Sequence, residues 1–222
     1  MIKHILIIPD GNRRYAKKKN IDLAVVYKYI SDDITTKLIK YLIIEKKVEE
    51  ISFFAISRNN VLKRKKSDLQ SIFDAQVESY QIWNQNKALT DNIKFKFVGD
   101  LSTLPEYYIK AAKALEEKTK KNKNGICNLL VAYDGNWEVL EAAKKVSQKG
   151  PFTLENFEKH LEISHIDLII RTGGEHRLSG APIWQSQYSE LYFSEKFYPE
   201  LTTEELEKVL KNYNERERRF GK

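Results

Sequence analysis

The chain has 222 residues, of which 41% are hydrophobic and 31% charged, and its formal net charge is +7. This length suits one domain, and we expect residues 1–222 to form one. The single cysteine, Cys127, excludes an intramolecular disulfide and a cysteine-rich zinc site. No apolar run approaches the roughly 18 residues of a membrane span, and the first apolar run is too short for a signal peptide. We therefore expect a soluble, cytoplasmic protein with at most peripheral membrane contact.

Apolar runs and helical patterns alternate along the sequence. The run HILIIP at 4–9 is apolar throughout, which predicts a strand buried on both faces. Residues 21–47 carry apolar side chains at spacings of three and four, which predicts a helix. In chain order we then predict a strand at 49–57, a helix at 67–89, a strand at 93–100, a helix at 105–121, a strand at 125–135, helices at 136–148 and 155–163, a strand that runs into a glycine turn at 166–175, a strand at 190–195, and a helix at 202–215. Ser67 is the expected cap of the helix at 67–89, and Thr202 or Thr203 that of the last helix, which also has a Glu at the capping-box spacing.

This alternation predicts an α/β fold with a mostly parallel central sheet and helices on both faces. Three of the predicted strands end in polar glycine turns, with the sequences PDGN, YDGN and RTGGE. Ligands of open parallel sheets bind beyond the carboxyl ends of the strands. These turns are therefore the predicted location of a functional site.

The first turn places Asp10 at the end of a buried strand, beside glycine and two arginines. The free N–H groups of a following helix favour an anion, whereas a carboxylate repels phosphate. A carboxylate at this position is favourable if Mg²⁺ lies between Asp10 and a phosphate-bearing ligand. The alternative is an ordinary turn in which Asp10 caps the helix, and the local sequence favours neither interpretation.

The turn RTGGEHRLS carries Arg171, Arg177 and Ser179 around two glycines. Two arginines and a serine can hold one diphosphate group through paired hydrogen bonds. The alternative is a solvated turn whose arginines pair with Glu175 and its neighbours. Glu190, which precedes an apolar strand, is either a second magnesium ligand or an exposed carboxylate. The net positive charge favours phosphate-bearing partners, but it does not distinguish nucleic acid, anionic lipid and diphosphate esters.

Together these motifs resemble those of the cis-prenyltransferases, the undecaprenyl diphosphate synthase family, in the same order and over nearly the whole chain. HILIIPDGNRRYAKK is similar to the family's opening motif, and FFAISRNN resembles its Ser-x-x-Asn segment. IKFKFVGD and NLLVAYDGNWEVLEA fit its third and fourth strand regions. The longest match is IDLIIRTGGEHRLSGAPIWQSQYSELYF, which is followed by FYPEL, and RERRFG resembles the family's C-terminal end.

The resemblance implies an enzyme that uses Mg²⁺ to condense an allylic prenyl diphosphate with isopentenyl diphosphate. The implied products are a cis-prenyl diphosphate and pyrophosphate. Asp10 would bind Mg²⁺ and assist the departure of pyrophosphate, and Glu190 would be the second metal ligand. Ser57 and Asn60 match the polar pair beside the reacting centre.

The resemblance also assigns residues to the two diphosphate groups and to a partner chain. Isopentenyl diphosphate would be held by Arg171, Arg177 and Ser179. The allylic diphosphate would be held by the turn that comprises Gly11, Asn12, Arg13 and Arg14. Arg219 and Gly221 match the family's Arg-x-Gly end, which reaches a partner's active site, and this match implies a homodimer.

Several positions depart from the family pattern, and most of them lie on the allylic side. Where the family has an arginine and then Gly-His-Lys, this chain has Leu23 and then Val26-Tyr27-Lys28. Tyrosine can donate a hydrogen bond but, unlike histidine, does not exchange protons near neutral pH. The remaining departures are Tyr15 for a tryptophan, Asn136 for a frequent arginine, and Lys63 or Arg64 in place of an arginine after the Ser-x-x-Asn segment.

Three alternatives follow from these departures and from the charge. The first is irregular, lavandulyl-type coupling of two dimethylallyl units, and the second is a catalytically weakened partner subunit, which the retained Asp10, Glu190 and arginines oppose. The third is a nucleic-acid-binding module, which would show a basic stripe with exposed aromatic side chains. The lysines are scattered along the chain instead, so we expect no nucleic-acid partner.

A growing prenyl chain needs an apolar tunnel closed to water. Its candidate walls are the helix at 21–47, the strand that contains Phe53 and Phe54, and the helix at 67–89 with Ile72, Phe73, Val77 and Trp83. Ordinary core packing is the alternative role for each of these residues.

Overall fold

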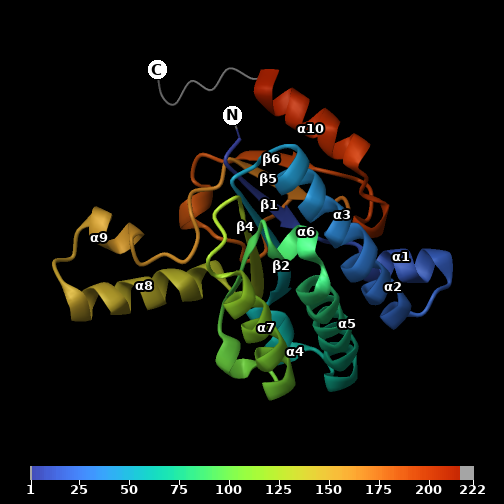
Figure 1. The fold of residues 1–222 in the computed structure, drawn as a ribbon, viewed down its shortest axis with the longest axis horizontal. Helices are drawn as coiled ribbons and strands as arrows, with labels where there is room; N and C mark the ends of the chain where they lie inside the picture. The colour runs from blue at the N-terminus through green and yellow to red at the C-terminus, as the bar shows by residue number, and fades with distance from the viewer. Residues whose placement is uncertain (1, 216–222) are drawn as a thin grey trace.

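The computed structural model describes residues 2–215 (Figure 1). Six strands form one sheet in the order β3–β4–β2–β1–β5–β6, and every neighbouring pair is parallel. The strands are β1 (His4–Ile8), β2 (Glu50–Ser57), β3 (Lys94–Val98), β4 (Ile126–Tyr133), β5 (Leu168–Arg171) and β6 (Glu190–Phe193). The predicted α/β fold with a parallel central sheet is confirmed, and the strands predicted at 93–100 and 166–175 end where their polar turns begin.

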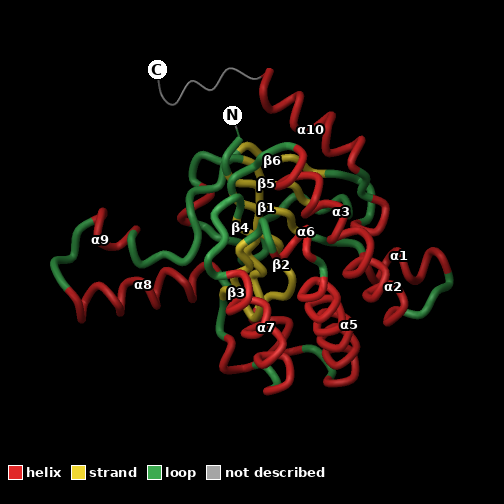
Figure 2. Tube along the Cα trace, viewed as in Figure 1, coloured by secondary structure: helices red, strands yellow, loops and turns green. Residues whose placement is uncertain are grey.

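The helices surround this sheet, as Figure 2 shows. They are α1 (Asn12–Lys19), α2 (Leu23–Tyr29), α3 (Thr36–Ile39), α4 (Arg58–Lys63), α5 (Lys66–Gln85), α6 (Lys87–Thr90), α7 (Glu106–Thr119), α8 (Gly135–Lys149), α9 (Leu154–Glu158) and α10 (Thr203–Glu215). None of the helices within residues 2–215 is long and apolar enough to cross a bilayer. Cytoplasmic localisation stays a prediction from the sequence.

The helix predicted at 21–47 is irregular. α2 and α3 are joined by a π-helical turn at Ile30–Thr35, and a second π-helical turn follows at Lys40–Glu45. The Thr35 hydroxyl donates to the carbonyl of Ile30, five residues earlier, at 2.7 Å. π-Helical turns widen a helix and are frequent at functional sites.

Two predicted caps have different outcomes. The helix predicted at 67–89 begins at Lys66 with Lys65 at the N-cap, so the prediction that Ser67 caps it is wrong. The Thr202 hydroxyl accepts a hydrogen bond from the Glu205 N–H at 3.3 Å, which confirms Thr202 as a cap of α10.

The two faces of the sheet are covered differently. Ile5 and Ile7 of β1 join the main core with α2, α5, α7 and α10. Leu6 and Ile8 face the other way and pack against Ile163 and other residues of the connecting segments. α8 and α9 pack on each other and extend away from the sheet (Figure 1). Helical cover is therefore concentrated on one face, and Cys127 is fully buried.

Candidate active site

Two of the polar turns meet at the carboxyl edge of the sheet. β1 and β5 are neighbours, and Ile8 pairs with Arg171 at their ends. The Thr172 hydroxyl donates to the Asp10 carbonyl and accepts from the Asp10 N–H, both at 2.9 Å. Gly173 has φ +87°, and a Cβ atom there would lie 3.1 Å from the backbone of Asp10 and Gly11. Only glycine therefore lets the two turns approach this closely.

Arg171 joins the two turns through its side chain, which is only 4% exposed. Its Nη2 donates to Asp10 Oδ2 at 2.7 Å, and its Nη1 donates to Ser179 Oγ at 2.8 Å and to the Arg177 carbonyl. Its Nε has no hydrogen-bond partner among residues 2–215. The guanidinium fork thus holds the Asp10 carboxylate and the 177–179 loop in one fixed arrangement.

Asp10 is held in its charged form. Burial acts to raise the pKa of its carboxyl group, but hydrogen bonds from Arg171 and the Gly11 N–H, and the charges of Arg171 and Arg14, outweigh it, so the pKa lies below its usual value. The Gly11 N–H donates to Asp10 Oδ1 at 2.6 Å, and Arg14 Nη2 lies 3.4 Å from the same oxygen. Asp10 is therefore a carboxylate, not a proton donor, near neutral pH.

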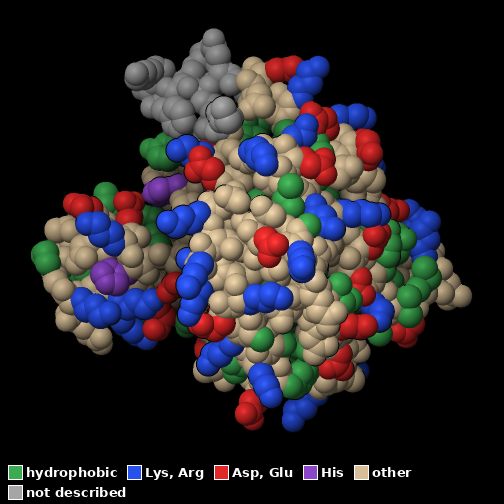
Figure 3. Space-filling model, in the orientation of Figure 1, with side chains coloured by type: hydrophobic (Ala, Val, Ile, Leu, Met, Phe, Trp, Pro, Cys, Tyr) green, Lys and Arg blue, Asp and Glu red, His purple; other side chains and the backbone are tan. Residues whose placement is uncertain are grey.

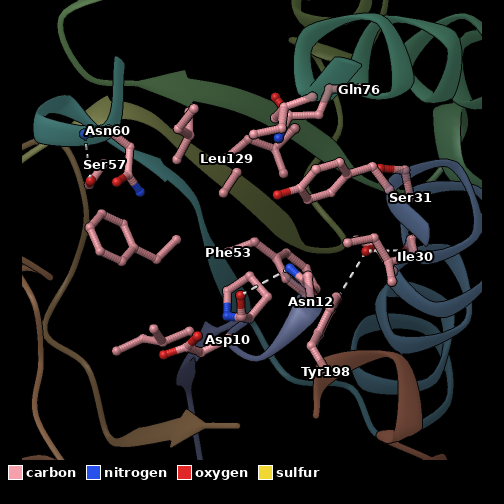
Figure 4. A pocket seen from close by; sticks show the side chains of 18 of the residues that line it. Asp10, Asn12, Ile30, Ser31, Phe53, Ser57, Asn60, Gln76, Leu129 and Tyr198 are labelled. Atoms are coloured by element: carbon pink, nitrogen blue, oxygen red, sulfur yellow. Dashed lines mark hydrogen bonds between the residues drawn. The ribbon is translucent and has the colours of Figure 1, made fainter. Parts of the chain in front are cut away.

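A cavity of about 570 Å³ adjoins this cluster (Figure 4). Its wall includes Asp10, Arg171, Arg177 and Ser179 from the two turns. Figure 4 shows Asp10 and Gln76 on opposite sides of the view, with Phe53 and Leu129 between them. The polar pair predicted after β2 also lies in the wall: Ser57 caps α4 by accepting from the Asn60 N–H at 3.1 Å.

A second cavity of about 280 Å³ adjoins the first and also has Asp10 in its wall. Arg13, Arg14 and Arg64 line it, and α1 begins there with no side-chain cap among the described residues. Pro9, Asp10, Asn12, Tyr27 and Arg64 belong to both cavities, and the other members of the second set are Gly11, Arg13 and Arg14. The predicted allylic turn and the predicted isopentenyl residues thus line two adjoining cavities that share the Asp10 carboxylate.

Some predicted residues lie outside this cluster. Lys63 is exposed and lines neither cavity, so Arg64, which does line both, is the residue that follows the Ser-x-x-Asn segment into the site. Tyr15 packs against the main core, with the Lys19 ammonium group over its ring, and it lines neither cavity. Asn136 is exposed at the start of α8. Arg219 and Gly221 lie outside the described residues.

The departures on α2 have different surroundings. Leu23 and Val26 pack in the main core. Tyr27 lines both cavities, and its hydroxyl accepts a hydrogen bond from Arg64 Nη1 at 3.4 Å. Tyr27 therefore contacts the site as a hydrogen-bonding group, the role that the sequence allows it.

Glu190 does not lie beside Asp10 within one chain. It begins β6 and pairs with Leu168, three residues before Arg171 along β5. At about 3.3 Å per residue, this places it roughly 10 Å from the carboxyl edge. Glu190 lines neither cavity, and residues 2–215 hold no group of three or more His, Cys, Asp or Glu side chains arranged for a metal. The strand register thus separates Glu190 from Asp10 within one chain, and the role of Glu190 as a second magnesium ligand stays a prediction.

Sequence reasoning missed four site residues. Thr172, which joins the two turns by hydrogen bonds, lies inside the RTGGE motif and could have been found there. Thr35, Gln76 and Tyr198 line the larger cavity, and the Thr35 and Tyr198 hydroxyls lie 2.9 Å apart. They come from segments whose sequences carry no sign of a site.

The comparisons with known proteins agree with this geometry. Residues 8–221 match the family model described as "Putative undecaprenyl diphosphate synthase". The chain belongs to this prenyltransferase family. It is 35% identical over 230 residues to the tritrans,polycis-undecaprenyl-diphosphate synthase (geranylgeranyl-diphosphate specific) of Pyrobaculum aerophilum, with 99% of this chain and 95% of that protein covered. It is 33% identical over 229 residues to an isoprenyl transferase of Campylobacter jejuni, with 100% and 99% covered.

Among solved structures, this family member resembles lavandulyl diphosphate synthase from Lavandula x intermedia in complex with dimethylallyl diphosphate. The TM-score is 0.90 at 28% identity, and the match covers 100% of this chain and 98% of that one. The family's fold is therefore shared almost completely.

The basic residues do not gather in one stripe on the face shown in Figure 3. There, Lys and Arg side chains are interspersed with Asp and Glu. Several are paired, as in Lys145 with Glu162 and Lys159 with Glu155. The arginines that line a cavity lie at the strand ends instead, where a compact anion can reach them.

Proposed function

We propose that the protein condenses an allylic prenyl diphosphate with isopentenyl diphosphate and releases pyrophosphate. The observation that carries this proposal is the pair of cation-lined cavities that share Asp10. The smaller cavity, at about 280 Å³, is several times the roughly 30 Å³ that one water molecule occupies in the liquid, so it has room for a compact anion.

The allylic diphosphate is assigned to the smaller cavity. Arg13, Arg14 and Arg64 line it, and the uncapped start of α1 adds its N–H groups. The allylic tail then extends into the larger cavity through the shared wall at Tyr27. This arrangement places the positive charges where the leaving pyrophosphate develops its negative charge.

Isopentenyl diphosphate is assigned to Arg171, Arg177 and Ser179, which line the larger cavity. Arg171 is already fixed by Asp10 and Ser179. Arg177, with a 60% exposed side chain paired to Glu175, is free to turn toward a diphosphate. One preorganised and one movable guanidinium suit a substrate that must bind and leave in every cycle.

Mg²⁺ fits this site through Asp10 alone. The ion binds proteins through one or two carboxylates and takes its other ligands from substrate phosphates and water. Asp10 is ionised and faces both cavities. When bound, Mg²⁺ would supply positive charge that stabilises the departing pyrophosphate.

The bond changes can be assigned to this chain's residues as follows. The allylic C1–O bond breaks and its electron pair leaves with pyrophosphate, which the arginines of the smaller cavity hold. The double bond of isopentenyl diphosphate supplies the electrons for the new C–C bond, and a proton leaves its C2. Because Asp10 has a lowered pKa and is paired with Arg171, it is a poor proton acceptor. The proton therefore goes to the released pyrophosphate.

The homodimer is part of the same proposal. β6 is an edge strand of the sheet, and large apolar side chains beside it are exposed: Ile183, Tyr188 and Leu191 are 51%, 66% and 45% exposed. Exposed apolar side chains at a strand edge favour association with another surface. A second copy of this chain is the occupant that the family resemblance favours.

Lavandulyl-type coupling is the second candidate function. The similarity to the Lavandula synthase at a TM-score of 0.90, together with Tyr27 at the allylic side, favours it. One incubation separates the two functions, using purified protein, Mg²⁺ and either dimethylallyl or geranylgeranyl diphosphate, with and without isopentenyl diphosphate. Products only in the presence of isopentenyl diphosphate support condensation. A ten-carbon branched product from dimethylallyl diphosphate alone would instead establish irregular coupling, and no product in any tube would refute both.

A further inference from the structure

The larger cavity has a partly polar wall where the tail of a prenyl chain would extend. Ser31, Gln76 and Ser79 line it there, beside the apolar Ile72 and Trp83. The Ser79 hydroxyl donates to Asp32 Oδ1 at 2.7 Å, so a carboxylate lies directly behind the wall. A chain of isoprene units has no group that can hydrogen-bond with these side chains.

Two helical segments show how far this polar region lies from the diphosphate end of the cavity. Residues 23–39 and α5 run side by side in the same direction, since Lys28 contacts Glu78, Asp32 contacts Ser79, and Thr36 Oγ1 accepts from Trp83 Nε1 at 2.7 Å. α5 begins at the diphosphate end, where Asp68 lies 3.8 Å from Arg13. At about 1.5 Å per residue, Gln76 lies roughly 12 Å and Ser79 roughly 16 Å further along the helix.

Gln76 is held with its amide turned toward the cavity. The Tyr80 and Tyr108 hydroxyls lie 2.6 Å apart, and Tyr108 donates to Gln76 Oε1 at 2.8 Å. Both tyrosines are almost fully buried. Because this chain of hydrogen bonds occupies the oxygen, the Gln76 N–H groups remain for the cavity; no acceptor for them is found within residues 2–215.

We propose that Ser31, Gln76 and Ser79 form a polar stop that limits the prenyl product to about two to four isoprene units. The inference rests on the proposed condensation and specifies its product class. An extended isoprene unit has four main-chain bonds and spans roughly 4.8 Å, by comparison with the three bonds of an extended residue. A depth of 12 to 16 Å therefore holds about three units.

Two aromatic rings of the cavity wall lead to the same product class. Tyr80 and Trp83 line the cavity beside Ser79 and are 3% and 2% exposed. They fill the space between α5 and the sheet, where they pack against Phe97 and Phe95. A longer chain would have to displace these rings or strip water from the polar wall.

The polar stop acts through desolvation. An apolar tail that covers the Gln76 amide removes its water and offers no hydrogen bond in return. One such unsatisfied group weakens binding by about tenfold or more. Each elongation past the stop is therefore disfavoured relative to release of the product.

Product length tests the inference. The purified protein is incubated with Mg²⁺, dimethylallyl diphosphate and excess isopentenyl diphosphate, and products are separated by liquid chromatography with mass detection. We expect wild-type products of 10 to 20 carbons. The double variant Gln76→Leu/Ser79→Ala should lengthen the most abundant product by at least five carbons. Gln81→Leu, on the exposed face of the same helix, is the matched control and should leave the lengths unchanged.

A second variant is needed because Gln76→Leu leaves the Tyr108 hydroxyl without its acceptor and so can destabilise the fold. Gln76→Glu keeps that acceptor and makes the wall more polar, so its products should be equal to or shorter than those of wild type. Wild-type products of 50 carbons or more, or longer products from Gln76→Glu, would overturn the polar stop alone. Absence of any condensation by the wild type would overturn the proposed function and this inference with it.

Discussion

The substitution Arg171→Lys separates the geometry of the guanidinium group from its charge. Arg171 donates to Asp10, to Ser179 and to the Arg177 carbonyl, and its side chain is 4% exposed. An ammonium group keeps the charge but cannot span the carboxylate on one side and the 177–179 loop on the other. At least one charged hydrogen bond is lost, at about 1.5–3 kcal/mol, and a buried acceptor is left without its donor.

We therefore expect Arg171→Lys to lower the free energy of unfolding by about 2–3 kcal/mol. If isopentenyl diphosphate binds this guanidinium, its KM should rise by about 10- to 100-fold as well. Urea unfolding followed by circular dichroism measures the first quantity, and initial rates measure the second.

Arg177→Lys is the matched control. Its side chain is 60% exposed and pairs with Glu175 at the surface, so the free energy of unfolding should change by less than about 0.5 kcal/mol. Its KM for isopentenyl diphosphate should still rise. If both variants unfold at the urea concentration of the wild type, the reasoning that Arg171 fixes the two turns is refuted.

Three further perturbations test other parts of the account. Because the folded pKa of Asp10 lies below its unfolded value of about 3.9, the ionised group stabilises the fold above that pH, and this contribution is lost as the pH falls through the folded pKa. Asp10→Asn should therefore flatten the dependence of unfolding free energy on pH below about 4, and a curve parallel to wild type would count against the ion pair. Gly173→Ala, at φ +87° and against the Asp10 backbone, should cost about 1–3 kcal/mol of unfolding free energy; thermal denaturation that matches wild type would show that the turns do not need glycine. Restoring the family's residues with Val26→Gly and Tyr27→His should change the donor preference or the product, and an identical product profile would show that α2 does not control the chemistry.

Much of the fold was predictable because its signals are local. The apolar run that becomes β1 and the polar turn that ends it both appear in the sequence. The rule that ligands bind at the carboxyl ends of parallel strands then brought Asp10 and Arg171 together correctly. Their direct ion pair was not predictable, because it requires β1 and β5 to be neighbours and Ile8 to be level with Arg171. Those are properties of the assembled sheet.

Two features show where sequence reasoning fails. Glu190 begins its strand, and only the register of β6 against β5 shows that this end of the strand is the far edge from Asp10. Gln76 lies on the same helix as Ile72 and Trp83, yet nothing in that pattern says that Tyr108 holds its amide toward a cavity. The π-helical turn at Ile30–Thr35 also escapes a search for a repeat of 3.6 residues, although it shapes the cavity wall.

The rate of turnover by Asp10→Ala measures how much the chemistry depends on this carboxylate. The claim is that one ionised carboxylate serves two diphosphate sites. The measurement is the initial rate of prenyl diphosphate formation from an allylic diphosphate and isopentenyl diphosphate with saturating Mg²⁺, for wild type and variant. The account predicts a rate at least about 100-fold lower in the variant, the loss typical of a group that stabilises transition-state charge. A variant that folds and keeps its rate within tenfold of wild type would contradict it.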